Sequence, residues 1–376
     1  MSNFIFADPR EKVELPDKVL TSHRQESWTY EILDRTDQVV GPLIGVKLGS
    51  GSLTYNTHAE VKSGGSLTYY GEEIDWDIHR IKITYKASTT YGEVEWPLGV
   101  FIVTKPEDNY SSTSRSQNLQ LMDKTQILVE DAVASTYVIP AKTKVTDAIR
   151  KLVLSTGESR IILEDSDEVT RVTQVWKAGT TKLRIINDLL DQINFFSIFA
   201  DTEGNFRGSK YVKPESRPAA WSFVTGENSI FKSEYTRTDD RYGRPNRFIV
   251  LASSDGTDDG IKGVAVDQAD YNKVKRWITR VEEGVEAATA AIAKEIAEKK
   301  LAAARSTSRN IEIHHAALPP MLNARTPFHT LHMAGDGVVQ TMDIPLVAGG
   351  MTKTSLRELK NERIGRAFNI RTGSGS

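Results

Sequence analysis

Strict alternation of apolar and polar residues is the feature that most constrains the fold of this chain. Five apolar residues occupy every second position between residues 94 and 102: Val94, Trp96, Leu98, Val100 and Ile102. Successive side chains of a strand point to opposite faces, so a period of two predicts half-buried β-strands. Shorter runs of the same kind occur at 28–32, 44–48, 53–55 and 67–69, with turn residues at 49–52 and 63–65. Short strands with regular turn signals are typical of a sandwich or barrel.

A change of phase interrupts this pattern. Ile74, Trp76 and Ile78 alternate in one phase, and Ile81, Ile83 and Tyr85 alternate in the other. A shift of one residue moves a strand's apolar side chains to the opposite face unless the strand bends or breaks. We therefore expect a bulge or bend near His79 and Arg80, and a hairpin loop over residues 86–92.

Helical spacing begins after residue 133. One apolar stripe comprises Val145, Ala148, Ile149, Leu152 and Val153. It predicts an amphipathic helix that starts at Thr143 and stops at Gly157. A second helix is expected to begin at Thr181 as N-cap, with the stripe Leu183, Ile186, Leu190 and Ile193. Residues 195–200 and 205–207 flank Asp201-Thr-Glu-Gly204, which predicts a hairpin with a tight turn.

The last third returns to strands around one long helix. Strands are expected at 248–251 and from Ile311, with a polar loop at 253–260. Residues 281–305 predict a helix with the stripe Val285, Ala288, Ile292 and Ile296. The expected fold is thus α+β and β-dominated. We expect an N-terminal arm (1–27), a first β domain (28–132) and a mixed α/β domain (133–230). A second β domain (231–366) containing the helix 281–305 and a flexible tail (367–376) would follow.

The composition of the chain excludes several kinds of functional site. The chain has no cysteine, which excludes disulfides, Cys-ligated zinc, iron–sulfur clusters and a thiol nucleophile. Lys plus Arg number 48 against 50 for Asp plus Glu, so there is no basic excess of the kind that tight nucleic-acid binding produces. The N-terminus does not resemble a secretion signal, and no apolar run is long enough to span a membrane. We expect synthesis and folding in a cytosol.

Motifs that carry chemistry are weak or absent. Gly49-Ser-Gly51 lacks the third glycine and the helix of a phosphate loop, and is better interpreted as a turn. Ser229-Ile-Phe-Lys232 matches a common four-residue pattern without its partner motifs. The acidic runs at 164–168 and 255–260 are interpreted as loops, because the second lacks calcium-loop spacing.

Two groups of residues could hold a metal or perform acid–base chemistry. Asp75, Asp77 and His79 lie at period two and would share one face of a strand, although a solvent face or subunit contact explains them better. His314, His315, His329 and His332 lie in one stretch, but His314 and His315 would point to opposite faces. We therefore expect no catalytic, cofactor-binding or metal-binding residue, and no enzymatic activity.

Two stretches resemble minor tail proteins of long-tailed phages that infect actinobacteria, in particular the tail-tip or baseplate hub. The first stretch contains WKAGTTKLRIINDLL at 176–190, INFFSIFAD at 193–201, GNFR at 204–207 and YVKPESR at 211–217. The second contains WTYEILDR at 28–35, KSGG at 62–65, IDW at 74–76, RIKI at 80–83 and LGVF at 98–101. The resemblance extends over residues 28–365. The sequence departs from the family pattern at Ala141-Lys142, where a glycine is expected before the predicted helix that contains Val145.

The resemblance implies a structural role. Such hub proteins form a homotrimer in which each subunit contributes two β-barrel-like tube domains, so that a pseudo-sixfold ring continues the tail tube. The implied partners are the distal tail protein ring and the central fibre or tip proteins of the same virion. DNA would pass through the lumen without specific binding, and the polar lumen would not be strongly basic.

Two other functions compete with this one. A tail-tip module that binds cell-surface carbohydrate or a receptor would need an exposed aromatic platform at Trp76, Trp96 or Trp221, and buried tryptophans would favour the hub. A cell-wall hydrolase would need two carboxylates or a metal cluster converging in a cleft.

Overall fold

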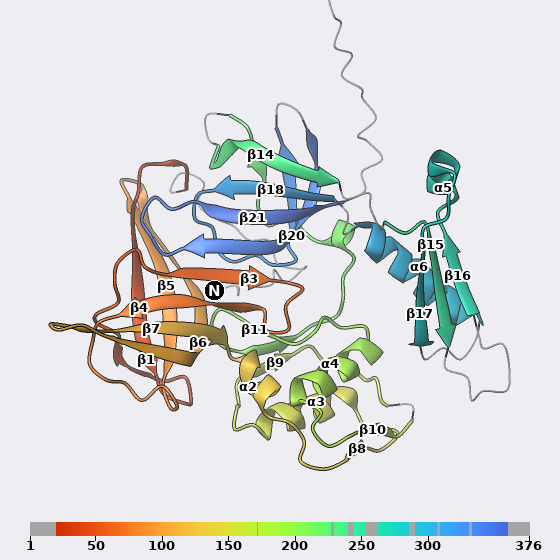
Figure 1. Cartoon of the computed structure of the whole chain (residues 1–376), viewed down its shortest axis with the longest axis horizontal. Coiled ribbons are helices and arrows are strands. Elements are labelled where there is room, and N and C mark those ends of the chain that lie inside the picture. Colours follow the sequence, from red (N-terminus) through yellow and green to blue (C-terminus); the bar gives the residue numbers. More distant parts are fainter. Residues whose placement is uncertain are drawn as a thin grey trace, which may run out of the picture.

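A single large sheet dominates the structure. The computed structural model describes residues 20–170, 172–226, 229–239, 244–252, 262–285, 290–306, 309–330 and 333–359. Their largest element is a 13-stranded sheet whose main path runs β14-β18-β21-β20-β3-β4-β7-β6-β5-β1-β2 (Figure 1). This path has two ends, so the described residues form an open sheet. The expectation of a β-dominated fold is confirmed, whereas the described strands form no closed barrel.

Seven strands of this sheet come from the first part of the chain. They are β1 (Gln25–Leu33), β2 (Val39–Pro42), β3 (Ser52–Asn56), β4 (Ser63–Tyr69), β5 (Arg80–Thr89), β6 (Gly92–Tyr110) and β7 (Arg115–Asp123). The alternation from Val94 to Ile102 lies within β6. The predicted loop at 86–92 is shorter than expected, because β5 extends to Thr89 and β6 begins at Gly92.

Two expected features of this part are wrong. Ile44 and Leu48 are 76% and 91% exposed in a loop, since Gly45 and Gly49 turn the backbone with φ of +106° and +71°. The predicted turn at 63–65 is instead the start of β4. Its glycines allow close strand pairing, because a Cβ at Gly65 would lie 2.2 Å from the Ser52 carbonyl oxygen.

The change of phase near His79 has a simple origin. Residues 71–79 form a turn-rich loop and no strand, and β5 begins at Arg80. The expected bend is therefore present, but the predicted strand through Ile74 and Ile78 is wrong. Trp76 is buried against Tyr69, which explains why an apolar residue occurs in this loop.

A mixed α/β unit follows the first strands. It contains α2 (Thr125–Glu130), β8 (Tyr137–Ile139), α3 (Val145–Leu154), β9 (Ile161–Leu163), β10 (Gln174–Trp176), α4 (Lys182–Gln192), β11 (Phe199–Ala200) and β12 (Phe206–Gly208), and is followed by the 3₁₀-helix η1 (Pro214–Ser216). The next strand, β13 (Phe223–Val224), belongs to the 13-stranded sheet. Its core includes Ile149, Leu152, Leu183 and Ile186.

Both predicted helices and the hairpin turn are present in this unit. The Thr181 hydroxyl accepts a hydrogen bond from the Arg184 amide, which confirms the N-cap of α4. Thr143 does not cap α3, because its hydroxyl donates to the Pro140 carbonyl instead. Lys142 has φ of +65° at the position where the resemblance led us to expect glycine.

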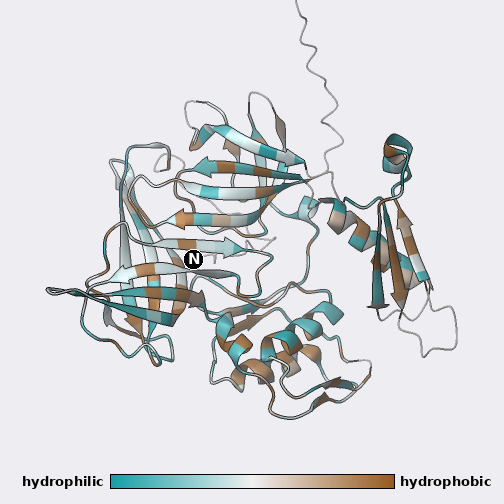
Figure 2. Ribbon diagram, viewed as in Figure 1, coloured by the Kyte–Doolittle hydropathy of each residue, from teal (hydrophilic) through white to brown (hydrophobic). Residues whose placement is uncertain are grey.

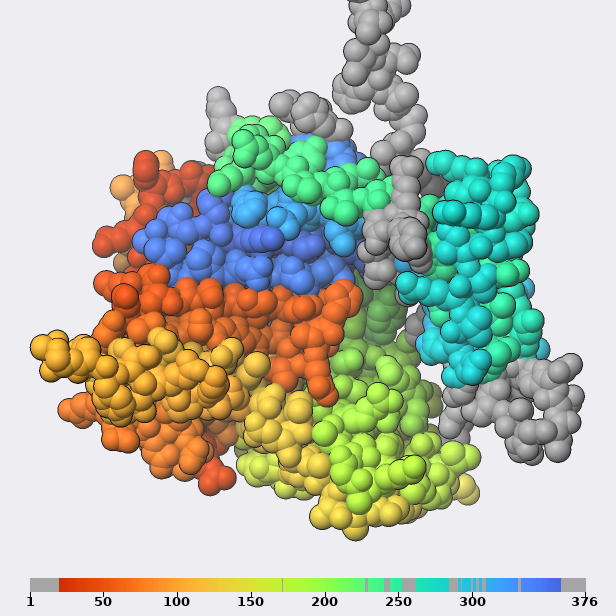
Figure 3. Space-filling model, in the orientation of Figure 1, coloured from red at the N-terminus to blue at the C-terminus, as the bar shows by residue number. Residues whose placement is uncertain are grey.

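The end of the chain completes the same sheet. It supplies β14 (Phe231–Asp239), β18 (Arg309–His315), β19 (Arg325–His329), β20 (Ala334–Pro345) and β21 (Thr352–Glu358). β20 pairs antiparallel with β3, with Met342 opposite Tyr55 and Ile344 opposite Leu53. All four side chains are buried in one core that includes residues from both ends of the chain. In Figures 1 and 3 the blue strands lie directly against the orange ones.

A small α/β unit is inserted between β14 and β18. It comprises β15 (Arg247–Ala252), β16 (Lys262–Val266), α5 (Gln268–Val274), β17 (Thr279–Val285) and α6 (Ala290–Ser306). The predicted helix 281–305 therefore begins too early, because residues up to Val285 pair with β15 as a parallel strand. The buried face of α6 is Ala293, Ala297 and Leu301, and Ile296 of the predicted stripe packs partly buried against the same core. The predicted loop 253–260 lies outside the described residues.

No helix in the described part of the chain is long and apolar enough to cross a membrane.

Candidate channel-lining face

The face of the sheet that points away from the core is polar. Side chains alternate along each strand, so that Leu53 and Tyr55 are buried while Ser52 and Thr54 are exposed. Figure 2 shows the corresponding alternation of brown and teal residues along the ribbons. Because β20 pairs with β3, this polar face continues without a break from the end of the chain to its beginning.

The strand register places polar residues in rows across the sheet. One row is His314, Lys353, Asp343, Thr54 and Gly64, and the next is Glu312, Ser355, Thr341 and Asn56. A further row pairs Ser52 with Ser66 and Gln120. Uncharged hydroxyl and amide side chains thus make up most of these three rows.

The charges on these rows nearly cancel. Lys353 Nζ lies 2.9 Å from Glu312 Oε2, and this hydrogen bond raises the pKa of the Lys353 ammonium. Asp343 lies opposite Lys353 in the register. The face therefore presents hydrogen-bonding groups to solvent and no cluster of cations within these rows.

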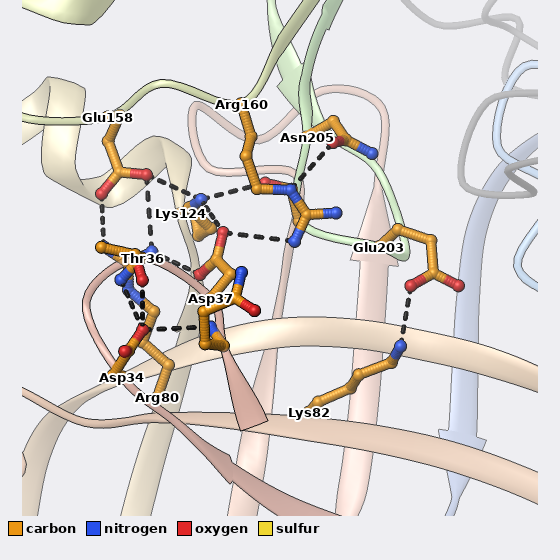
Figure 4. Close-up of polar contacts among 12 residues, drawn as sticks. Asp34, Thr36, Asp37, Arg80, Lys82, Lys124, Glu158, Arg160, Glu203 and Asn205 are labelled. Atoms are coloured by element: carbon orange, nitrogen blue, oxygen red, sulfur yellow. Dashed lines mark hydrogen bonds and ion pairs between the residues drawn. The ribbon is translucent and has the colours of Figure 1, made fainter. Parts of the chain in front are cut away.

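A buried ion cluster fixes the sheet to the mixed unit (Figure 4). Lys124, between β7 and α2, has a fully buried side chain whose Nζ lies 2.5 Å from Asp37 Oδ2 and 2.7 Å from Glu158 Oε2. Arg80, the first residue of β5, contacts the same two carboxylates. Asp37 comes from the β1–β2 turn and Glu158 from the loop after α3, so the cluster joins two parts of the fold.

Two observations show that the cluster is well satisfied. Lys124 Nζ also donates to the Gly204 carbonyl at 3.0 Å, in the β11–β12 turn. Burial would lower the pKa of Arg80, but the charges of Glu158 and Asp37 outweigh it and raise the pKa. Nearby, Lys82 and Glu203 form a half-buried pair at 2.7 Å. We assign the cluster a positioning role, since it holds the polar sheet in a fixed relation to the mixed unit.

Sequence reasoning missed this cluster. Its members lie far apart along the chain, and each belongs to an ordinary turn, loop, strand start or helix start. The positive φ of 62° at Asp37, which suits an Asp in a tight turn, is known only from the structure and gave no signal in the sequence.

The acidic candidates for chemistry do not converge. Asp75 and Asp77 belong to the loop before β5, where Asp75 Oδ1 accepts from the Asp77 amide and the Asp75 carbonyl accepts from His79 Nδ1. The interpretation of these residues as one face of a strand is wrong. Residues 164–168 follow β9 without regular structure, and 255–260 lie outside the described residues.

The histidines are separated by the sheet. His315 is fully buried on β18 and bonded to Thr354 Oγ1 at 2.7 Å, whereas His314 lies on the opposite, polar face as predicted. His329 ends β19, and His332 lies outside the described residues. In the part of the chain that the structure describes, no three histidine or carboxylate side chains come together as a metal site would require.

The tryptophans singled out from the sequence offer no open aromatic platform. Trp76 and Trp96 are 8% and 3% exposed, and Trp221 packs against the main core. Trp96 stacks on Tyr85 at 4.5 Å and is part of the lining of an open groove of about 530 Å³ over β1, β5 and β6. The rest of that lining is largely charged and hydroxyl side chains, as in the Lys86–Glu95 pair.

Comparison with known proteins identifies solved structures with a similar fold. The sequence matches no family model and no curated protein. Among solved structures, the tail protein from Neisseria meningitidis MC58 aligns with a TM-score of 0.66 and 13% identity over 89% of this chain and 97% of that one. This chain has a tail-protein fold.

Two prophage proteins support the same conclusion. The 43 kDa tail protein of prophage MuSo2 from Shewanella oneidensis aligns with a TM-score of 0.63 and 16% identity, over 88% of this chain and 98% of that one. The prophage tail protein gp18 from Listeria monocytogenes EGD-e aligns with a TM-score of 0.52 and 11% identity, over 89% and 96%. At such low identities the likeness extends to the fold and not to individual residues.

Proposed function

We propose that this chain is a structural component of a phage tail tip and forms a homotrimeric hub ring that continues the tail tube. The observation that carries the proposal is the pairing of β20 with β3. It joins a segment from the end of the chain, β14-β18-β21-β20, to a longer one from its beginning, β3-β4-β7-β6-β5-β1-β2. Three subunits would supply six such segments, which suits a junction with a sixfold tube.

The polar face supports the proposed lumen. A channel through which DNA moves must not hold the phosphate backbone, and retention depends mainly on Lys and Arg contacts to phosphates. The rows that cross β3 and β20 carry hydroxyl and amide groups with balanced charges, as such a channel requires. The likeness to prophage tail proteins agrees with this role.

The remaining parts of the proposal concern place and partners. The ring would sit at the tail tip of a siphophage of actinobacteria, between the distal tail protein ring and the central fibre or tip proteins. It would be made in the host cytoplasm and have no enzymatic activity. We propose two tube-wall domains, one on each side of the β20–β3 join, with the mixed unit outside the wall.

The mass of the purified protein in solution tests this proposal. One subunit is 41.8 kDa, so a trimer has a mass of about 125 kDa by light scattering. We expect a trimer, either alone or when the other tail-tip proteins are added. A protein that stays monomeric with every tail component would refute the ring and direct attention to carbohydrate binding.

Added charge tests the channel. Thr54→Lys with Ser66→Lys places two cations per subunit on exposed positions of the polar face. We expect unchanged trimer mass, new salt-dependent DNA binding and slower DNA release from assembled phage. The matched control, Thr54→Gln with Ser66→Gln, adds length without charge and should release DNA normally. Equal release from both variants would show that this face does not line the channel.

A further inference from the structure

The inserted α/β unit has one covered and one open sheet face. α6 packs on the face formed by Phe248, Val250 and Ala265. The approach is close, because a Cβ at Gly263 would lie 2.1 Å from the Ala293 carbonyl carbon. Strand alternation therefore directs the neighbouring residues of β15, β16 and β17 to the other side.

That other side is apolar and exposed. Val264, Ile249 and Val281 form one row across the three strands, and Val266, Arg247 and Thr279 form the next. Val264, Val266 and Val281 are 37%, 50% and 53% exposed. Figure 2 shows brown residues on all three strands. Contiguous exposed apolar residues on a sheet are typical of an interaction surface.

An aromatic and cationic border adjoins this open face. The Arg247 guanidinium lies 5.0 Å from the ring centre of Trp277, and Trp277 stacks on Tyr271 at 4.1 Å. Trp277 is 37% exposed, and Lys275 and Arg276 beside it are exposed. This positive charge is local to the border, because residues 244–306 as a whole contain 11 Lys and Arg against 10 Asp and Glu. The open face thus suits an acidic partner with apolar side chains.

The same chain carries a surface of that chemistry. The loop 71–79 exposes Glu72, Glu73, Asp75 and Asp77 around Ile78, which is 42% exposed. The buried Trp76 fixes the loop on the first sheet, where its Nε1 donates to Gln117 Oε1 of β7, and the Asp75 hydrogen bonds hold the loop together internally. In Figure 1 the strands β1–β7 and the inserted unit lie at opposite ends of the longest axis, which favours a contact between copies over one within a copy.

We propose that the open face of the inserted unit binds the loop 71–79 of the adjacent copy in the ring. Two different surfaces at opposite ends of one subunit make a head-to-tail contact, which closes into a ring when rotation permits. The apolar rows would cover Ile78, and Arg247, Lys275 and Arg276 would face the four carboxylates. This inference rests on the proposed trimeric hub and specifies which surfaces of its subunits meet.

Cysteine cross-linking tests the contact without background, because the chain contains no cysteine. Val264→Cys protein is mixed with Ile78→Cys protein, together with the other tail-tip proteins, and treated with a short bismaleimide. We expect a covalent dimer containing one of each variant, and a circular covalent trimer from the double variant. The control pair, Val175→Cys with Ile78→Cys, uses another exposed valine and should not cross-link.

Mass measurements on the same samples separate the possible failures. A trimer mass without the Val264–Ile78 link, or a link from Val264→Cys to a different tail protein, overturns the docking surface and leaves the hub intact. Monomers in every mixture overturn both.

Charge reversal gives an independent readout of the same contact. Glu72→Lys should reduce the trimer fraction at low salt, and adding Arg276→Glu should restore it at least in part. No restoration in the paired variant would argue against this charge pairing.

Discussion

Removing the buried ammonium of Lys124 is expected to destabilise the protein strongly. The Lys124→Met variant keeps most of the side-chain volume but leaves Asp37 and Glu158 with fewer cations in a desolvated site. Breaking a buried pair from one side costs about 3–5 kcal/mol. With a denaturant dependence of about 3 kcal/mol per molar urea, the midpoint of urea unfolding should fall by roughly 1–1.7 M.

A matched surface pair provides the control. Lys86 and Glu95 lie 2.9 Å apart, but their side chains are 46% and 53% exposed. Lys86→Met should therefore cost less than about 1 kcal/mol. Adding Glu158→Gln to Lys124→Met removes the excess carboxylate and should recover part of the loss. Equal midpoints for Lys124→Met and Lys86→Met would refute the view that the cluster holds the sheet to the mixed unit.

Three further changes probe other parts of the fold. Burial lowers the pKa of His315 to about 4, below the value of about 6.5 that an unfolded chain would have. Stability is therefore highest above about pH 6.5 and falls by up to about 3 kcal/mol as the pH drops towards 4. The urea midpoint of His315→Gln should depend less on pH in that window. Gly263→Ala should unfold the inserted unit, because the new Cβ meets the α6 backbone, and hydrogen exchange should rise there while β3 stays protected. Thr181→Ala removes the cap of α4 and should lower stability by about 1 kcal/mol in the same urea assay.

Local patterns in the sequence predicted local elements well. The stripes from Val145 and from Leu183 gave α3 and α4, and the alternation from Val94 gave the centre of β6. These patterns succeed because one face of each element contacts one core. Ile44 and Leu48 alternate without belonging to a strand, since glycine turns interrupt the backbone there.

The same local patterns do not predict contacts between distant parts of the chain. Residues 281–285 precede a stretch rich in Ala, Glu and Lys and are predicted to start its helix, yet they pair with β15, because a parallel partner was available in the folded chain. The ion cluster of Lys124 and the β20–β3 join depend on residues from distant parts of the chain, and no periodicity within a short window contains that information. The polar face became visible only when the register of β20 against β3 was known.

The β20–β3 join also constrains how the protein is made. β3 is complete by residue 56, whereas its partner β20 begins only at residue 334. One edge of β3 pairs early with β4, but the other has no native neighbour until β20 has left the ribosome, and unpaired strand edges promote aggregation. Pairing over such a sequence distance makes folding slow. A chain that stops before residue 334 lacks β20 and leaves this edge of β3 unpaired.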